Sequence, residues 1–480
     1  MKKYKIFLII LGLTAQNLFA QMIGSVGTGD VRSISMGNTY STSAFGVHAL
    51  GINPANLFEE TGASIELVFP FPLPSVSFQA GTNFLSLDEY NYFFGTKTTD
   101  PVTGKETGRY LTDDDKTRLK NLFADGGTVS EDLQFHLFAL LIKPTKSIAI
   151  SLSASEIISS SVTFPKGIID LGIDGNLPNT VYNFNDTKFS SWWIRKYSLS
   201  FANNLDLFPK LKSFTIGFSI NLYHGFAYSG LDHVNTELTT GSGNVITGNG
   251  DFTAYSAFSP DLNVKYNFDN AGSKQDPNVS LFPTPAGKGI GMDFGINTRI
   301  NDVLSFGLAV TDIGQIKWNK NAAQYSSNKA IYLDDLSNQD QVDSLAKALT
   351  GKDSGKYIDQ FITRLATALH FGASIQIDKM FKAEFPGKLL WAFDYNQGFN
   401  DMPGNTVKPR FSTGGDWDLG TFSFRTGFSI GGIDKFRWGL GFGVNLGIYE
   451  MNFGTSNFNS LVSPNSAKRF SLGFDSVWRF

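Results

Sequence analysis

Histidine and cysteine are the side chains that most often bind metals, and in this chain they form no recognisable site. No two histidines stand at the His-x-x-x-His spacing, and the chain has no cysteine. Thiolate metal ligands, disulfides and a lipidated N-terminal cysteine are therefore excluded. We expect no metal site and no cofactor. The histidines are His48, His136, His224, His233 and His370.

Glycine loops and clustered carboxylates could also carry chemistry, but here local structure explains them. The stretch GSVGTGD at residues 24–30 follows no strand and opens no helix, so the phosphate-binding geometry of such loops is missing. Asp113, Asp114 and Asp115 suit the first turn of a helix, where carboxylates complement the dipole. The sequence has no Ser/His/Asp order, no nucleophile elbow and no paired acids on matching strands. We therefore expect that the protein is not an enzyme.

The composition narrows the class of protein. The chain has 480 residues and a formal net charge of -3, so it lacks the positive charge that drives binding to nucleic acid. Residues 1–20 read as a signal peptide, with a basic start, an apolar core at 6–13 and a small residue, Ala20, before Gln21. That core is too short to span a bilayer, and no later apolar run is longer. The exported chain is then either soluble or a transmembrane β-barrel.

Alternation with a period of two is the clearest pattern in the chain. In KFRWGLGFGVN, residues 435–445, one face carries Phe436, Trp438 and Leu440, and the other carries Arg437, Gly439, Gly441 and Gly443. The apolar face suits lipid and the second face suits a packed or wet interior. A soluble β-sandwich also alternates, but its second face rarely carries a file of glycines.

About fifteen segments fit this strand pattern, and a closed barrel needs an even number. We assign residues 251–267 to a long outer loop, or to a β-arm above the barrel, which leaves about fourteen strands. The fold class is then all-β, a transmembrane antiparallel barrel at residues 63–480. The other candidates are 63–78, 133–143, 147–155, 196–205, 213–226, 289–299, 303–312, 364–377, 388–396, 408–416, 421–430, 435–445, 449–454 and 469–480.

Two of the long loops carry helix signals. In the first, Thr112 is an N-cap with Asp115 three residues later. In the second, Val342, Leu345 and Leu349 form one apolar stripe that Gly351 stops, and a second stripe consists of Ile358, Phe361 and Ile362. These helices would form a partial lid over the barrel mouth or would simply order neighbouring loops.

Charged residues on the inward faces must find partners. Arg425 and Arg437 should face the lumen from adjacent strands, together with Arg410 and Asp394, because buried charges are stable only when paired. We expect them to pin the structure rather than to bind a ligand. Their expected partners are one another, Asp30 and Asn53.

The segment GDVRSISMGNTYSTSAFGVHALGINPANL resembles the start of the FadL-like barrels, which are outer-membrane long-chain fatty-acid channels and their relatives. The matching residues are Met36 and Gly37, then Asn53, Pro54 and Ala55. The resemblance implies that residues 21–62 form a hatch inside the lumen. Inward Gly439, Gly441 and Gly443 would make room for that hatch.

Two other segments resemble known barrels. The last strand, ending on Phe480, resembles the C-terminal signature that the barrel-insertion machinery reads in outer-membrane barrels. LSFGLAVTDIGQIKW at residues 304–318 looks like a strand of the same broad group, which includes families of bacteria with type IX secretion.

The resemblance implies a channel in the cell outer membrane, in contact with its lipid, that takes up hydrophobic small molecules such as fatty acids. The alternative is a non-transporting interaction barrel, PorV-like and linked to type IX secretion or surface assembly, with a secretion-system protein as partner. A third reading is a secreted soluble β-protein such as an adhesin, whose aromatic faces would be buried between sheets. Neither binding to nucleic acid nor binding of a metal is expected.

Overall fold

The computed structural model describes residues 30–480 except 59–61, 96, 100–103, 105, 109, 125, 176, 267, 269–279, 335–337, 342, 345–353 and 382–384. The expected signal peptide at residues 1–20 lies outside the described residues. Within them, no helix is both long and apolar enough to cross a bilayer.

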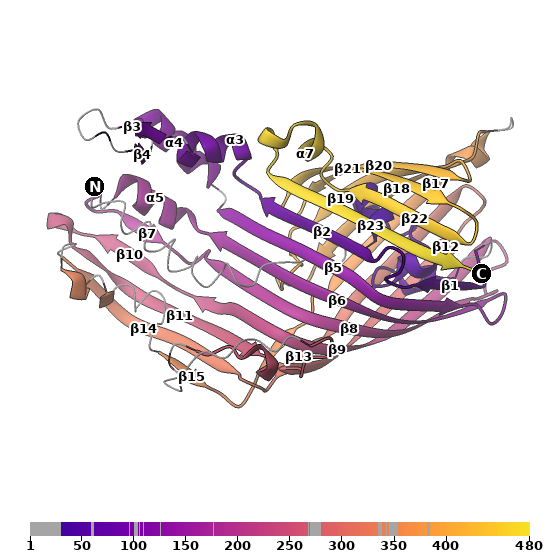
Figure 1. Ribbon diagram of the computed structural model, residues 1–480, viewed down its shortest axis with the longest axis horizontal. Helices are drawn as coiled ribbons and strands as arrows, with labels where there is room; N and C mark the ends of the chain where they lie inside the picture. The colour runs from indigo at the N-terminus through magenta and orange to yellow at the C-terminus, as the bar shows by residue number, and fades with distance from the viewer. Residues whose placement is uncertain are drawn as a thin grey trace.

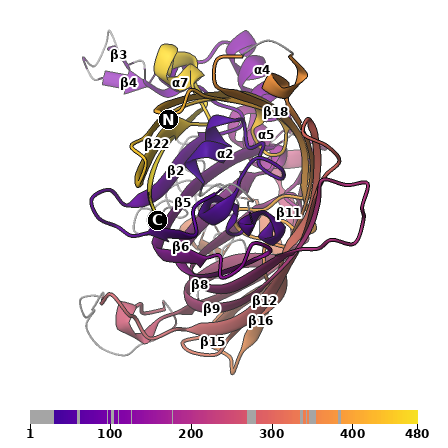
Figure 2. The ribbon, with the colours of Figure 1, turned by 90° about the vertical axis from the view of Figure 1, so that its right-hand side faces the viewer.

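The described chain folds into a closed antiparallel β-barrel of fourteen wall strands, seen from the side in Figure 1 and from one end in Figure 2. The first wall strand consists of two pieces, β1 and β2, and both pair with β23, which closes the barrel. This confirms the expected fold class. The wall strands are β1 (Ile65–Val68) with β2 (Ser75–Thr82), β5 (Gly127–Ile142), β6 (Ile148–Phe164), β8 (Lys188–Asn204), β9 (Ser213–Val234), β12 (Gly287–Arg299), β13 (Leu304–Trp318), β16 (Phe361–Arg364) with β17 (Ala368–Gln376), β18 (Lys388–Gly398), β19 (Arg410–Asp418), β20 (Phe422–Gly431), β21 (Lys435–Asn445), β22 (Tyr449–Thr455) and β23 (Arg469–Arg479).

The period-two alternation separates side chains on the outer surface of the barrel from side chains in its interior. On β21 the rings and aliphatic groups of Phe436 and Leu440 are exposed on the outer surface, whereas Arg437 and Gly439 are buried in the interior. Successive side chains of a strand point to opposite faces, so one strand supplies both an apolar wall and a polar lumen.

The expected strand at residues 63–78 is wrong as a single element, because residues 69–74 interrupt it between β1 and β2. The interruption reads Phe-Pro-Phe-Pro-Leu-Pro. Proline has no backbone N–H to give to the ladder, so three prolines in alternation end the pairing. Phe69 and Phe71 are 53% and 72% exposed there.

The short turns and the long loops lie at opposite ends of the barrel, which we call the short-turn end and the long-loop end. The C-terminus and β1 lie at the short-turn end (Figure 1). At the long-loop end, β11 (Ile246–Phe258) pairs with β9 and with β14 (Ala323–Leu333) and so forms the β-arm alternative for residues 251–267. The arm also includes β7 (Val181–Asn183), β10 (Glu237–Thr240) and β15 (Gly355–Tyr357).

The helix at the first long loop is confirmed. It is α4 (Asp113–Leu122), and Thr112 and Asp115 form a capping box at its start. The helix expected around Ile358, Phe361 and Ile362 is wrong, because Phe361 and Ile362 belong to β16, where edge pairing with β13 satisfies the backbone. Val342, Leu345 and Leu349 lie outside the described residues.

The remaining elements at the long-loop end include α3 (Leu87–Tyr90), η3 (Asn91–Gly95), β3 (Lys97–Thr99), β4 (Glu106–Gly108), α5 (Lys166–Asp174), η4 (Ser242–Asn244), η5 (Pro260–Leu262), α7 (Asn459–Val462) and η7 (Pro464–Ser466). In addition, η6 (Ile377–Met380) follows β17.

Candidate functional site

Residues 30–58, which we call the hatch, lie inside the ring of strands (Figure 2). They form three short helices, α2 (Val31–Ser35), η1 (Gly46–Ala49) and η2 (Pro54–Leu57). The side chain of Asp30 caps α2 by accepting from the Ser33 N–H at 2.7 Å, and that of Asn53 caps η2 by accepting from the Ala55 N–H at 3.1 Å. Local caps of this kind help a short segment to hold a defined shape.

Glycines of the wall bring the hatch backbone close to the strands. A Cβ on Gly427 or Gly439 would collide with the backbone of residues 34–37, and one on Gly441 would collide with the Ser35 side chain. The structure places Met36 and Gly37 at this contact. The file of glycines on β21 therefore fits the space that the hatch occupies.

The second motif of the hatch meets glycines on the other side of the barrel. A Cβ on Gly295 would collide with Asn53, and one on Gly217 with the backbone of Pro54 and Ala55. Gly443 differs from the expectation, because a Cβ there would meet Ser423, Asn452 and Arg425 instead of the hatch. Its absent side chain makes room for a network of polar wall groups.

Arg425 and Arg437 both lie in the lumen, but their partners are not the expected Asp30 and Asn53. Arg437 donates to Asn38 Oδ1 at 3.0 Å, and Arg425 donates to Asp416 at 2.9 Å. Asp416 also accepts from Arg32 of the hatch at 3.0 Å. The sequence could not give these partners, because neither α2 nor the turn at Asn38 was foreseen.

A buried aspartate of the wall, Asp394, also holds the hatch, whereas Arg410 pairs within the wall. Asp394 accepts from the Tyr40 and Ser41 N–H groups at 2.9 and 2.8 Å and from the Ser41 hydroxyl at 2.6 Å. Arg410 lies 3.6 Å from Asp434, in the turn between β20 and β21. The hatch is thus held by polar contacts from several strands.

We expect Arg437→Ala to loosen the hatch more than the wall. The change removes the donor to Asn38 and one of the cations around Asp434. Burial alone would raise the pKa of Asp434, but the charges of Arg437, Arg469 and Arg410 hold it well below its usual range. Losing the hydrogen bond from the charged Arg437 to Asn38 of the hatch costs about 1.5–3 kcal/mol. Limited proteolysis of the folded barrel should therefore cut the N-terminal segment faster.

Arg364→Ala is the matched control, because Arg364 is an exposed arginine of β16. It should leave the cleavage rate unchanged. Heat-dependent gel mobility reports in parallel whether each barrel is folded. Unchanged cleavage of a folded Arg437→Ala barrel would contradict the pinning role.

A partly open pocket lies between the hatch and the first wall strands. Its apolar lining comes from both: Val47, Leu50, Ile52, Val68, Ala139, Ile157 and Val477. Val68 and Ser75, which both line it, flank the interruption at residues 69–74. The pocket therefore lies directly behind the break in the first wall strand, which we call the strand break. The sequence signal for the strand break is the FPFPLP stretch at residues 69–74, which lies within the expected strand 63–78.

Charged and polar groups form the rest of the pocket lining. Lys196 donates to Asp312 at 2.6 Å and lies 3.5 Å from Asp293. Asp312 belongs to the DIG motif of β13 and has a φ of 55°, which points to a local constraint at this position. Sequence reasoning missed this cluster because its members come from three strands.

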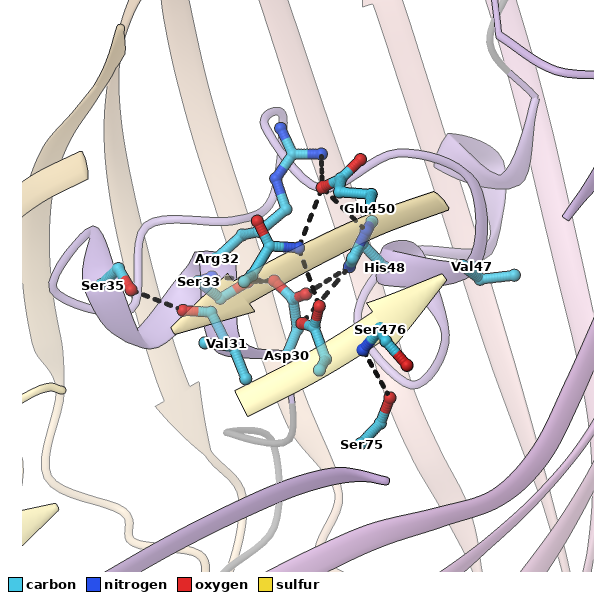
Figure 3. Close-up of polar contacts among 12 residues, drawn as sticks. Asp30, Val31, Arg32, Ser33, Ser35, Val47, His48, Ser75, Glu450 and Ser476 are labelled. Atoms are coloured by element: carbon cyan, nitrogen blue, oxygen red, sulfur yellow. Dashed lines mark hydrogen bonds and ion pairs between the residues drawn. The ribbon is translucent and has the colours of Figure 1, made fainter. Parts of the chain in front are cut away.

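A second charged cluster joins the hatch to β22 and β23 (Figure 3). His48 Nδ1 lies 2.7 Å from Asp30 Oδ1 and 3.9 Å from Asp475 Oδ2, and His48 Nε2 lies 3.8 Å from Glu450. Burial favours the neutral forms of both hatch residues, but their mutual attraction wins: it raises the pKa of His48 and lowers the pKa of Asp30 to about 2. This attraction stabilises the contact between His48 and Asp30.

The lining of the pocket is thus partly apolar and partly charged. Such a lining suits an amphipathic guest, whose apolar part faces Val68, Ala139 and Val477 and whose polar end meets His48 or Lys196. The spacing of the histidines does not predict the contacts of His48, because its carboxylate partners are distant in sequence.

Comparison with known proteins gives one family match. A model described as a family of unknown function (DUF5723) matches residues 63–455. No curated protein sequence matches the chain.

Three solved structures that match the chain are remote from it in sequence. The toluene transporter TodX of P. putida has 13% identity and a TM-score of 0.43, over 95% of this chain and 99% of that chain. The monoaromatic hydrocarbon channel CymD has 10% identity and a TM-score of 0.43, over 96% and 99%. A FadL homologue of Pseudomonas aeruginosa has 11% identity and a TM-score of 0.42, over 96% and 99%. FadL is the family that the N-terminal motifs resemble.

Proposed function

The chain belongs to the family of unknown function DUF5723, and we propose that it forms an outer-membrane channel for hydrophobic or amphipathic small molecules such as fatty acids. The observation that carries the proposal is the pocket directly behind the strand break. A guest in this pocket has a short path to the lipid side of the wall.

The outer surface of the barrel supports a place in a membrane. Large apolar side chains are exposed on strand after strand, and each gains about 1.5–3 kcal/mol on full transfer to apolar surroundings. An exposed aromatic belt of this extent suits lipid rather than water. Examples are Phe294, Leu308, Phe371, Phe393, Phe411, Phe424, Phe436, Phe453 and Leu472.

The route that we propose runs through the lumen and out through the wall. The guest enters at the long-loop end, reaches the pocket beside the hatch and leaves sideways past Val68 and Ser75. The hatch closes the axial path, since its polar contacts reach several strands. In this account the barrel has no enzymatic activity, and its buried charges serve to hold the hatch and to orient the guest.

The last strand of the chain bears on how the barrel is inserted into the membrane. We propose that the insertion machinery reads the last strand, β23, which alternates and ends next to Phe480. Outer-membrane lipid is then the permanent partner of the apolar belt.

Mass spectrometry of co-purified small molecules tests the proposal. The protein is extracted into native lipid discs, because detergent displaces ligands. We expect a fatty acid or another apolar compound to be enriched well above its share of bulk lipid. A second sample from an unrelated barrel of similar size corrects for lipid that adheres to the belt. An equal profile in both samples would contradict the transport proposal.

A second candidate function is that of an interaction barrel, and one observation favours it. The β-arm and the nearby helices at the long-loop end expose Tyr110, Val181 and Tyr332 to solvent. Such a surface fits a partner platform, including a type IX secretion component. A pull-down from gently solubilised membranes discriminates the two functions: a stoichiometric secretion-system protein with an empty pocket would favour the platform.

A further inference from the structure

Three potential metal ligands from distant segments meet where the hatch contacts the wall. Asp30, His48 and Asp475 each offer one ligand atom, and these atoms lie within 4.8 Å of one another. Asp30 precedes α2, His48 lies on η1 and Asp475 lies on β23. The three side chains belong to residues that are 8%, 5% and 4% exposed. Figure 3 shows Asp30 and His48 turned toward each other.

In both Asp30 and Asp475, one carboxylate oxygen accepts hydrogen bonds from neighbouring groups, and the other oxygen is left for a ligand. Asp30 Oδ2 accepts from the Ser33 N–H at 2.7 Å and from its hydroxyl at 2.5 Å, so Oδ1 faces His48. Asp475 Oδ1 accepts from Asn452 Nδ2 at 2.7 Å, whereas the buried Asp475 Oδ2 has no hydrogen-bond partner. An orphaned buried carboxylate oxygen is costly, and a cation would satisfy it.

The second nitrogen of His48 fits the surroundings of a metal ligand. His48 Nε2 is buried without a hydrogen-bond partner and lies 3.8 Å from Glu450 Oε1. Histidine ligands commonly direct their other ring N–H to a carboxylate, which fixes the tautomer. With Nδ1 as the ligand atom, the proton would lie on Nε2 and face Glu450.

The charges of the surrounding network leave room for a divalent cation. The ion pairs of this network join five carboxylates to three guanidinium groups and to His48. With His48 neutral, the network carries two excess negative charges, and with His48 protonated it carries one. A divalent cation bound to neutral His48 balances it. The members are Asp30, Glu66, Asp416, Glu450, Asp475, Arg32, Arg425, Arg479 and His48.

We propose that Asp30, His48 and Asp475 bind a divalent transition-metal ion such as Zn²⁺ at the point where their ligand atoms meet. One imidazole and two carboxylates suit such an ion better than Mg²⁺ or Ca²⁺, which prefer oxygen alone. Two ligands come from the hatch and one from β23, so the ion cross-links the hatch to the wall. All three ligand residues also line the pocket, which leaves a coordination position open toward it.

Isothermal titration of the full-length barrel in lipid discs tests the site. The protein is first stripped with a chelator and exchanged into metal-free buffer, and Zn²⁺ is then titrated. We expect one high-affinity site per barrel and at least about tenfold weaker binding in Asp475→Asn and in His48→Gln. Zn²⁺ should also slow protease cleavage of the hatch in the unmodified protein and not in these two variants.

Asp394→Asn is the control, because Asp394 is also a buried wall aspartate that holds the hatch but is not one of the three proposed ligands. It should keep the Zn²⁺ affinity. His48→Gln leaves the wall sequence intact, so it stays informative even if Asp475→Asn does not fold, which gel mobility reports. Absence of saturable Zn²⁺ binding, equal binding in a folded His48→Gln barrel, or equal affinity for Mg²⁺ would each overturn the proposal. The site does not depend on transport, so a barrel that carries no fatty acid leaves this test unchanged.

Discussion

Closing the strand break should stop lateral transfer of a fatty acid while the barrel stays folded. In the proposed variant a single Thr replaces residues 69–74. On β23 the partners of Leu67 and Val76 are Trp478 and Phe474, four residues apart. With one residue between Val68 and Ser75, Leu67 and Val76 are also four positions apart, so the first wall strand keeps its register with β23. It also keeps Val68 and Ser75 on the inner face.

We expect this variant to lower the transfer rate of a fluorescent fatty acid roughly tenfold or more, which corresponds to at least about 1.4 kcal/mol in the barrier. The measurement follows transfer from the lumen side into proteoliposome lipid. The control replaces Phe69 and Phe71 with Ala, which removes the two exposed rings but keeps the break. Equal transfer in the closed variant and in the unmodified barrel would show that the guest does not leave through this gap.

Removing the hatch should open the barrel along its axis. Deletion of residues 21–58 removes the segment that fills the space beside Gly217, Gly295 and Gly439. Large barrels without a plug leave an aqueous channel, so we expect ion conductance in a planar bilayer to rise by roughly an order of magnitude.

Arg437→Ala serves as an intermediate in the same assay, because it weakens one attachment of the hatch without deleting it. Its conductance should flicker between that of the closed and that of the deleted barrel. The deletion variant must first show the gel mobility of a folded barrel. Equal conductance with and without residues 21–58 in folded barrels would contradict the role of the hatch as a plug.

Period-two alternation predicted most of the wall, although the expected strands 63–78 and 364–377 are each interrupted in the structure. Residues such as Phe436 and Arg437 reveal their opposite environments directly, because a lipid-facing side and a polar lumen impose opposite chemistry on neighbouring positions. The number of strands followed from parity once residues 251–267 were set aside. Their pairing with β9 and β14 as an arm could not be derived, because an arm strand and a wall strand share the same local pattern.

The functional features were harder to predict, since they depend on contacts between distant segments. Asp475 meets His48 only because β23 closes the barrel beside the hatch, and no local spacing encodes this. The strand break was visible as FPFPLP, but alternation of Phe and Pro imitates a strand when hydrophobicity alone is counted. Weighing the missing N–H groups of Pro70, Pro72 and Pro74 would have placed the break correctly.

Photo-crosslinking of a guest inside the barrel tests the central claim most directly. A fatty acid that carries a diazirine group is incubated with the protein in native lipid discs and irradiated, and the labelled peptides are mapped by mass spectrometry. We predict labels on peptides that contain Val68, Ala139 and Val477, and their loss when unlabelled fatty acid competes. Labels confined to outer residues such as Phe436 and Leu440, with no competition, would mean that the pocket holds no such guest and would contradict the channel account.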